Sequence, residues 1–146
     1  MAEFIENAIQ LVEVNQNVLL DSSIPCNKGY VVHRAGSGIV TLRGIVNNPC
    51  CGFARYQVVF NGNIAVPSTP TAGTPGEISV ALAIDGEAVQ TSRARVTPAA
   101  VDEYFNVTST AIITVPKGCC YTVAVENTSD QAINVQNANL TVSRIA

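Results

Sequence analysis

VPKGCCYTVAVENTSDQAINVQNANLTVSRIA, residues 115–146, is the stretch that decides the fold. Residues 116–118 (Pro-Lys-Gly) predict a turn, because proline fixes φ and glycine tolerates positive φ. Residues 121–126 then alternate apolar and more polar side chains, the period of two that is typical of a strand with one buried face. Asn127 to Asp130 predicts the next turn, since short polar side chains bond their own backbone.

A long strand follows this second turn and ends the chain. Ile133 and Val135 share one face of it. The later apolar residues reach the same face only if one residue near Gln136 and Asn137 is bulged; they are Ala138, Leu140 and Val142. The C-terminal strand is therefore predicted to belong to the core of a sheet, and the fold is predicted to be all-β.

The rest of the chain repeats the pattern of strand and turn. Ile78 to Ile84 is the cleanest alternation, and the following Asp85-Gly86 is a preferred hairpin dipeptide. A strand from Phe53 to Val66 directs Tyr56, Val58 and Phe60 one way and Arg55, Gln57 and Asn61 the other. A strand over 105–115 has apolar spacing that slips across 108–110. Shorter strands are expected within 9–20, 30–34, 39–43 and 89–96, with loops at 21–29 and 67–76.

Composition favours one domain, residues 1–146, that hides part of its surface. Apolar residues make up 47% of the chain and charged residues only 13%, against roughly 25% charged in an average domain. So little charge favours burial between subunits. The small side chains of Ser79, Ala81 and Ala83 share one strand face, which allows close approach of another β layer and makes them the predicted subunit interface.

Charge and hydropathy exclude several other classes. The net charge is −3 and the basic residues are spread singly, so no footprint for nucleic acid is expected. No apolar stretch approaches the ~20 residues that span a membrane. Residues 1–6 contain two acids and no cationic apolar run, so no secretory signal is expected and the chain would be made in the cytoplasm. Residues 1–8 are expected to form a flexible or anchoring arm.

Eight or more short strands without an amphipathic helix predict a sandwich or barrel, and the two long loops favour a Greek-key jelly roll. Residues 78–89 (ISVALAIDGEAV) resemble the mid-domain hairpin of bacterial and phage tumour-necrosis-factor-like (complement-type) jelly rolls. Residues 115–118, 123–128 and 139–144 resemble the closing strands of that family. These domains tip bacterial collagen-like surface proteins and decorate virions. The resemblance covers about half the chain, and its motifs are structural.

The resemblance implies a non-enzymatic homotrimer on a virion or on a bacterial cell or spore surface. Because no collagen-like stalk is present, the sequence looks more like a capsid-decoration or head-fibre protein of a phage than the tip of a spore filament. The alternative is a module that binds a sugar or a receptor through loops at one pole. No cofactor and no metal are expected under either hypothesis.

Five cysteines are the most reactive side chains: Cys26, Cys50, Cys51, Cys119 and Cys120. The loop before Phe53 and the turn at 116–118 should lie at one pole of a jelly roll, which brings the two doublets close together. Adjacent cysteines rarely bridge each other, so disulfides would join the doublets or two subunits. Free thiols are an equal alternative, whereas a zinc site lacks the usual C-x₂₋₄-C spacing.

The other candidates for catalysis favour structural roles. His33 is the single histidine and stands beside Arg34 in a predicted strand. Ser37 lacks the G-x-S-x-G pattern of a nucleophile elbow. Consecutive Asp102 and Glu103 would face opposite sides of a strand and are better explained by a solvated turn. Three N-x-T/S sequons start at Asn106, Asn127 and Asn139, where β-prone polar residues are the simpler explanation.

Overall fold

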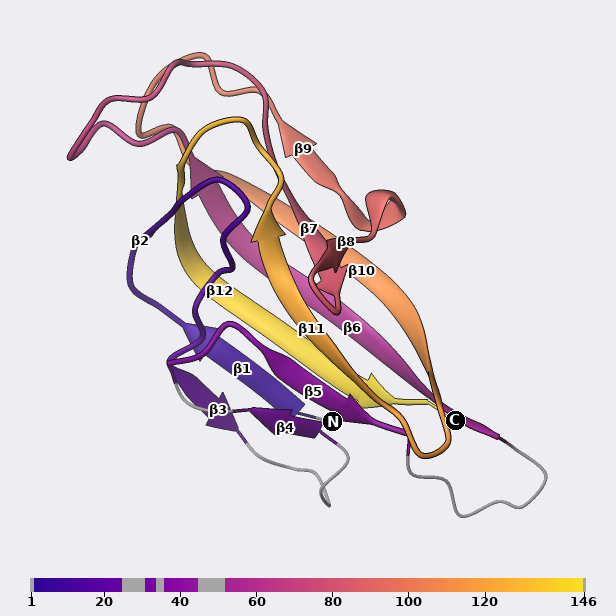
Figure 1. The fold of residues 1–146 in the computed structure, drawn as a ribbon. Coiled ribbons are helices and arrows are strands. Elements are labelled where there is room, and N and C mark those ends of the chain that lie inside the picture. The colour runs from indigo at the N-terminus through magenta and orange to yellow at the C-terminus, as the bar shows by residue number, and fades with distance from the viewer. Residues whose placement is uncertain (1, 25–30, 34–35, 45–51, 146) are drawn as a thin grey trace.

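The computed structural model describes residues 2–24, 31–33, 36–44 and 52–145, which form two antiparallel sheets stacked as a sandwich (Figure 1). Each sheet has six strands. The first sheet has the order β10-β6-β12-β1-β3, with β2 paired to β12, and the second has the order β4-β5-β11-β7-β8, with β9 paired to β7. No helix in the described part of the chain is long and apolar enough to cross a membrane.

The strand bounds are as follows. The first sheet contains β1 (Ala2–Glu6), β2 (Gln10–Val12), β3 (Ser22–Ile24), β6 (Phe53–Ala65), β10 (Phe105–Pro116) and β12 (Ile133–Arg144). The second contains β4 (Val31–His33), β5 (Val40–Arg43), β7 (Ile78–Ile84), β8 (Glu87–Ala88), β9 (Ala94–Val96) and β11 (Cys120–Asn127), with a 3₁₀ turn η1 (Gln90–Ser92) before β9. Since β10, β11 and β12 alternate between the sheets, the chain crosses the sandwich repeatedly, as a Greek-key jelly roll requires.

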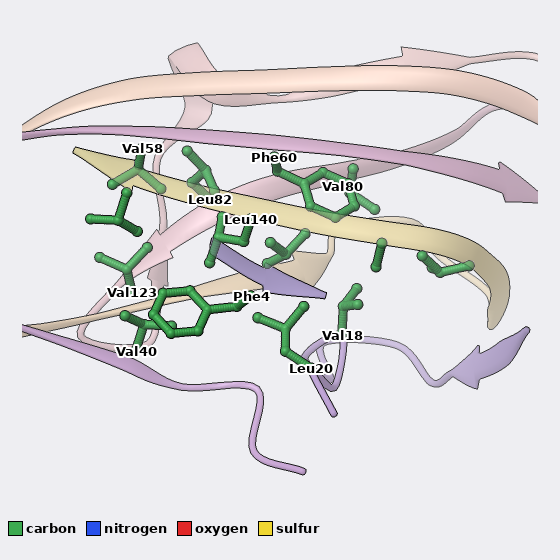
Figure 2. Packing of buried hydrophobic residues seen from close by; sticks show 14 of the residues in the cluster. Phe4, Val18, Leu20, Val40, Val58, Phe60, Val80, Leu82, Val123 and Leu140 are labelled. Carbon is green, nitrogen blue, oxygen red and sulfur yellow. The ribbon is translucent and has the colours of Figure 1, made fainter. Parts of the chain in front are cut away.

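Strand β6 shows the period of two that the sequence predicts. Tyr56, Val58 and Phe60 are fully buried, whereas Arg55 and Gln57 are exposed. Their side chains meet apolar residues of the second sheet in one interior; Figure 2 shows Phe60 and Leu140 with Val80 and Leu82. The Tyr56 hydroxyl also donates a hydrogen bond to the backbone oxygen of Arg43, which ties β6 to the opposite sheet.

Strand β12 contains the predicted bulge. Its register against β6 shifts between Gln136 and Asn139, and Asn137 has a φ of 55°. The extra residue returns the later apolar side chains to the interior, where Ala138, Leu140 and Val142 are buried. The C-terminal strand lies between β6 and β1, so it occupies the middle of its sheet.

Two further local predictions have different outcomes. The β7–β8 hairpin turns at Asp85 and Gly86 with φ of 52° and 85°, the primed turn expected for this dipeptide. The expected slip in β10 is wrong, because its pairing with β6 is continuous from Phe105 to Pro116. Ser109 is buried on the inward side of β10, and its hydroxyl donates a hydrogen bond to the Ser92 carbonyl. A polar residue with a hydrogen-bond partner therefore takes one inward position, and the alternation of inward and outward side chains continues through it.

The N-terminal residues differ from the expected flexible or anchoring arm. Strand β1 pairs with both β12 and β3, and it buries Ala2 and Phe4 in the core. Residues 22–24 form β3 where a loop was expected. Of the apolar residues within 9–20 that predict a strand, Ile9, Leu11 and Val14 are exposed by 55%, 40% and 38%, whereas Val18 and Leu20 are buried.

Replacing Phe60 with alanine should destabilise the fold by about 3–5 kcal/mol, because it removes a fully buried ring and leaves a cavity. Chemical denaturation measures this free energy of unfolding. Val32→Thr, at a residue 42% exposed on β4 of the second sheet, is the control and should change it by less than about 0.5 kcal/mol. Equal effects of the two substitutions would contradict the assignment of the core face.

Candidate functional site

The sandwich has two ends, defined by the two ends of β6. At the cysteine end (residues 43–44, 52–53 and 116–120), Phe53 pairs with Pro116 and the Lys117 backbone N–H donates to the Gly52 carbonyl at 2.8 Å. At the loop end (residues 64–79, 92–105 and 127–132), the Asp102 backbone N–H donates to the Val66 carbonyl at 2.8 Å. The turn at 117–119 and the loop after β6 therefore lie at opposite ends of the molecule (Figure 1).

The cysteine end exposes two thiols. Cys119 and Cys120 are free and exposed in the described part of the chain. The backbone of Cys119 is fixed, since its N–H donates to the Pro116 carbonyl and its carbonyl accepts from the Gly44 N–H. Cys26, Cys50 and Cys51 lie outside the described residues, so the linkage between the doublets stays a prediction.

The loop end is built on a buried amide, Asn127. Its Nδ2 donates to the carbonyls of Val12 at 3.0 Å and Gln131 at 2.9 Å, and its Oδ1 accepts from the Ser129 N–H at 2.9 Å. These bonds join the segment after β2 to the turn between β11 and β12. The Asn127 side chain, which begins one of the three N-x-T/S sequons, is therefore used in hydrogen bonds within the fold. Burial raises the pKa of the neighbouring Glu126.

A chain of hydroxyl groups extends this network onto β7. Ser129 Oγ accepts from the Ser79 N–H at 2.8 Å, and Ser79 Oγ lies 2.7 Å from Thr128 Oγ1. Ser79, Ala81 and Ala83 are exposed by 1% or less within the single chain. These three residues, the predicted subunit interface, therefore offer almost no free surface to a second subunit, because other parts of the same protomer cover them.

Arg93 rests on this chain of hydroxyl groups. Its Nε donates to Ser79 Oγ at 3.0 Å and its Nη2 donates to the Thr128 carbonyl at 3.1 Å. Both acceptors are neutral, and the half-buried guanidinium forms no ion pair within the described residues. Nearby Arg95 instead pairs with Glu77 at 3.5 Å.

An open cavity of about 670 Å³ lies in front of Arg93. Gln131 closes one side, since its amide bonds both the N–H and the carbonyl of Thr74 at 2.9 and 2.8 Å. This clamp holds the loop after β6 against the β11–β12 turn. The lining consists of Thr74, Pro75, Gly76, Glu77, Ser79, Arg93, Thr128, Ser129, Asp130 and Gln131.

The remaining candidates have structural partners. His33 Nε2 is 2.9 Å from the Ser37 carbonyl, and its ring packs on Phe4. Ser37 Oγ accepts from the Ile39 N–H. Asp102 accepts from the Ser68 hydroxyl in a turn, with no contact to Glu103 among the described hydrogen bonds. No group of three or more potential metal ligands is found in residues 2–24, 31–33, 36–44 and 52–145.

Sequence reasoning missed Arg93 because nothing local marks it. The residue follows a hairpin and stands between Ser92 and Ala94, in an ordinary polar context. Its partners Ser79 and Thr128 are distant in sequence and meet it only in the folded sandwich. The loop at 67–76 gave the one usable signal, since a long connection at a pole suggested a binding surface.

Comparison with solved structures agrees with the geometry of the sandwich. The globular domain of a zebrafish complement 1qA protein superposes with a TM-score of 0.64 and 12% identity, over 99% of this chain and 96% of that one. The Eiger TNF of S. frugiperda gives a TM-score of 0.65 and 12% identity, over 100% and 92%. No protein-family model and no curated protein matches the chain.

These likenesses define the class of fold. The chain is a Greek-key jelly roll of the tumour-necrosis-factor-like and complement-type kind, as the sequence predicted. At this level of identity the comparisons concern the fold, and function has to be argued from this chain's own surfaces.

Oxidation should link Cys50 or Cys51 to Cys119 or Cys120. A bridge across the separation of about 70 residues restricts the unfolded chain by a few kcal/mol in the entropy model, so reduction should lower the melting temperature. Mass spectrometry of peptides from unreduced protein, with a reduced control, identifies the bond. Finding only free thiols after air oxidation would contradict the linkage.

Proposed function

We propose that this chain is a non-enzymatic structural protein that assembles as a homotrimer on a virion, as a capsid-decoration or head-fibre protein, or on another bacterial surface assembly. The fold supports a non-enzymatic module, since the similar structures are named as a complement domain and a tumour necrosis factor. The observation that supports assembly most strongly is the outer surface of the first sheet.

The part of this surface on β6, β10 and β12, called the sheet face below, carries little charge, and Glu3 of β1 lies at its border, where its carboxylate accepts from Asn139 Nδ2 at 3.2 Å. Register pairs Thr110 with Val59 and Ile112 with Gln57 on it, and Ile112 is 59% exposed. Among its residues on β6, β10 and β12 only Arg55 is charged; they are Phe53, Arg55, Gln57, Val59, Asn61, Asn63, Asn106, Thr108, Thr110, Ile112, Thr114, Asn139, Thr141 and Ser143. The centres of protein interfaces are depleted of charge in the same way.

Polar groups on the sheet face are partly satisfied within the protomer. Asn106 Nδ2 donates to Asn61 Oδ1 at 2.8 Å, and Thr141 Oγ1 donates to Asn139 Oδ1 at 3.1 Å. Burying a polar group costs less when it already has a hydrogen-bond partner. A second copy of the chain that covers the part of this face on β6, β10 and β12 therefore desolvates one charged side chain, Arg55, whose guanidinium lies 5.8 Å from the centre of the Phe53 ring.

The placement on a virion or a bacterial surface is supported by the sequence resemblance. The hairpin that carries it, residues 78–89, includes the expected β7–β8 pair. The other matching stretches lie at the end of β10 and the turn after it, in β11 with the residue after it, and in β12. A trimer would present three equivalent attachment surfaces to a repetitive lattice. The binding alternative finds support in the cavity at Arg93, which is independent of the sheet face.

Ile112→Asp should break the trimer into monomers, because it places a carboxylate on β10 within the sheet face, where burial of a charge is costly. Sedimentation velocity reads the change in mass. Ile39→Asp, at a residue 46% exposed beside β5 of the other sheet, is the matched control and should stay trimeric. A trimeric Ile112→Asp variant would place the interface elsewhere.

The assembly role is tested with a tagged chain expressed from its own gene in its natural context. Particles from the lysate are separated on a density gradient, and the tag is followed through the fractions. We expect the chain to co-sediment with virions or surface particles in a fixed ratio to their main protein. A chain that stays at the top of the gradient, in lysates that contain intact particles, would contradict the role.

A further inference from the structure

We propose that the cavity at Arg93 binds a saccharide that bears a carboxylate group. The inference goes beyond the structural role and does not depend on the trimer. It rests on three features of the loop end: an anchored cation without an ion-pair partner among the described residues, acidic residues in the cavity lining, and hydroxyl and amide groups in the same lining.

Arg93 is held in place for a ligand. A guanidinium has five N–H donors in a rigid fork, and two of its nitrogens are fixed by Ser79 Oγ at 3.0 Å and the Thr128 carbonyl at 3.1 Å. These neutral acceptors orient the group but leave its charge unbalanced. Arg93 lines the cavity, so we expect its remaining N–H donors to serve a ligand there. A planar carboxylate can accept two parallel hydrogen bonds from such a fork.

The acidic residues of the lining restrict the anion. Glu77 is compensated by Arg95 at 3.5 Å, whereas Asp130 is exposed and has no partner among the described ion pairs. Repulsion from a carboxylate grows with the charge of the ligand. A monoanion such as a sugar carboxylate is therefore favoured over phosphate, whose charge at neutral pH is larger.

The rest of the cavity suits the hydroxyl groups of a sugar. Thr74, Thr128 and Gln131 supply hydroxyl and amide groups, and the volume of about 670 Å³ is within the usual range of ligand sites. No aromatic side chain is in the lining, so ring stacking adds nothing and a single site binds weakly.

The experiment is a ¹H–¹⁵N chemical-shift titration of the whole chain with small monovalent ligands. Methyl glucuronide and methyl glucoside form a matched pair, because they differ only in carboxylate against hydroxymethyl. We expect the glucuronide to bind at least 10-fold more tightly, with shifts at residues 74–79, 93 and 128–131. Equal binding of the two sugars, no binding of the glucuronide, tighter binding of inorganic phosphate or shifts elsewhere would overturn the proposal.

Variants then test the roles of single residues. Arg93→Gln should weaken glucuronide binding at least 10-fold. Arg43→Gln removes the same charge from an exposed side chain at the cysteine end and should leave the affinity unchanged. Asp130→Asn should tighten binding, because it removes a repulsive charge. An equal loss in the two arginine variants would overturn the proposal, and so would an unchanged Asp130→Asn affinity, which decides the matter even if Arg93→Gln fails to fold.

Discussion

The structure depends on one apolar interior that the inward faces of both sheets share. Alternate residues of β6, β12 and β1 enter it from one side, and alternate residues of β7, β11 and β5 enter from the other. Successive side chains of a strand point to opposite faces of the sheet, so the neighbours of each inward-facing residue point outward. The residues of the outer surface are thus determined by the same alternation, and on β6, β10 and β12 they include one charged side chain, Arg55.

The loop end follows a second constraint, which is that buried polar groups need hydrogen-bond partners. Asn127 satisfies this need by bonding Val12, Gln131 and Ser129, and in doing so it sets the shape of the β11–β12 turn. That turn offers the Thr128 carbonyl to Arg93. The position of Arg93 in the cavity lining therefore depends on the turn that the buried Asn127 side chain holds.

Most of the fold could be predicted from patterns within a few neighbouring residues. The features that were predicted wrongly or missed depend on contacts between residues far apart in the sequence. The bulge near Asn137 and the Asp85-Gly86 hairpin could be predicted because their causes lie within a few residues. Strand β1 could not, since Phe4 is buried by pairing with Leu140, at the other end of the chain. The Arg93 cavity was missed for the same reason: the loop after β6, β7 and the β11–β12 turn meet there only after folding. The small residues of β7 were correctly placed opposite the core face, but the protomer itself covers them.

We propose that this jelly roll conceals its sheet face, which carries little charge, by binding copies of itself. Sedimentation velocity of the untagged chain at micromolar concentration tests this claim most directly. We expect a single species with about three times the 15.3 kDa mass of one chain. A well-behaved species of 15.3 kDa at the same concentration would contradict it.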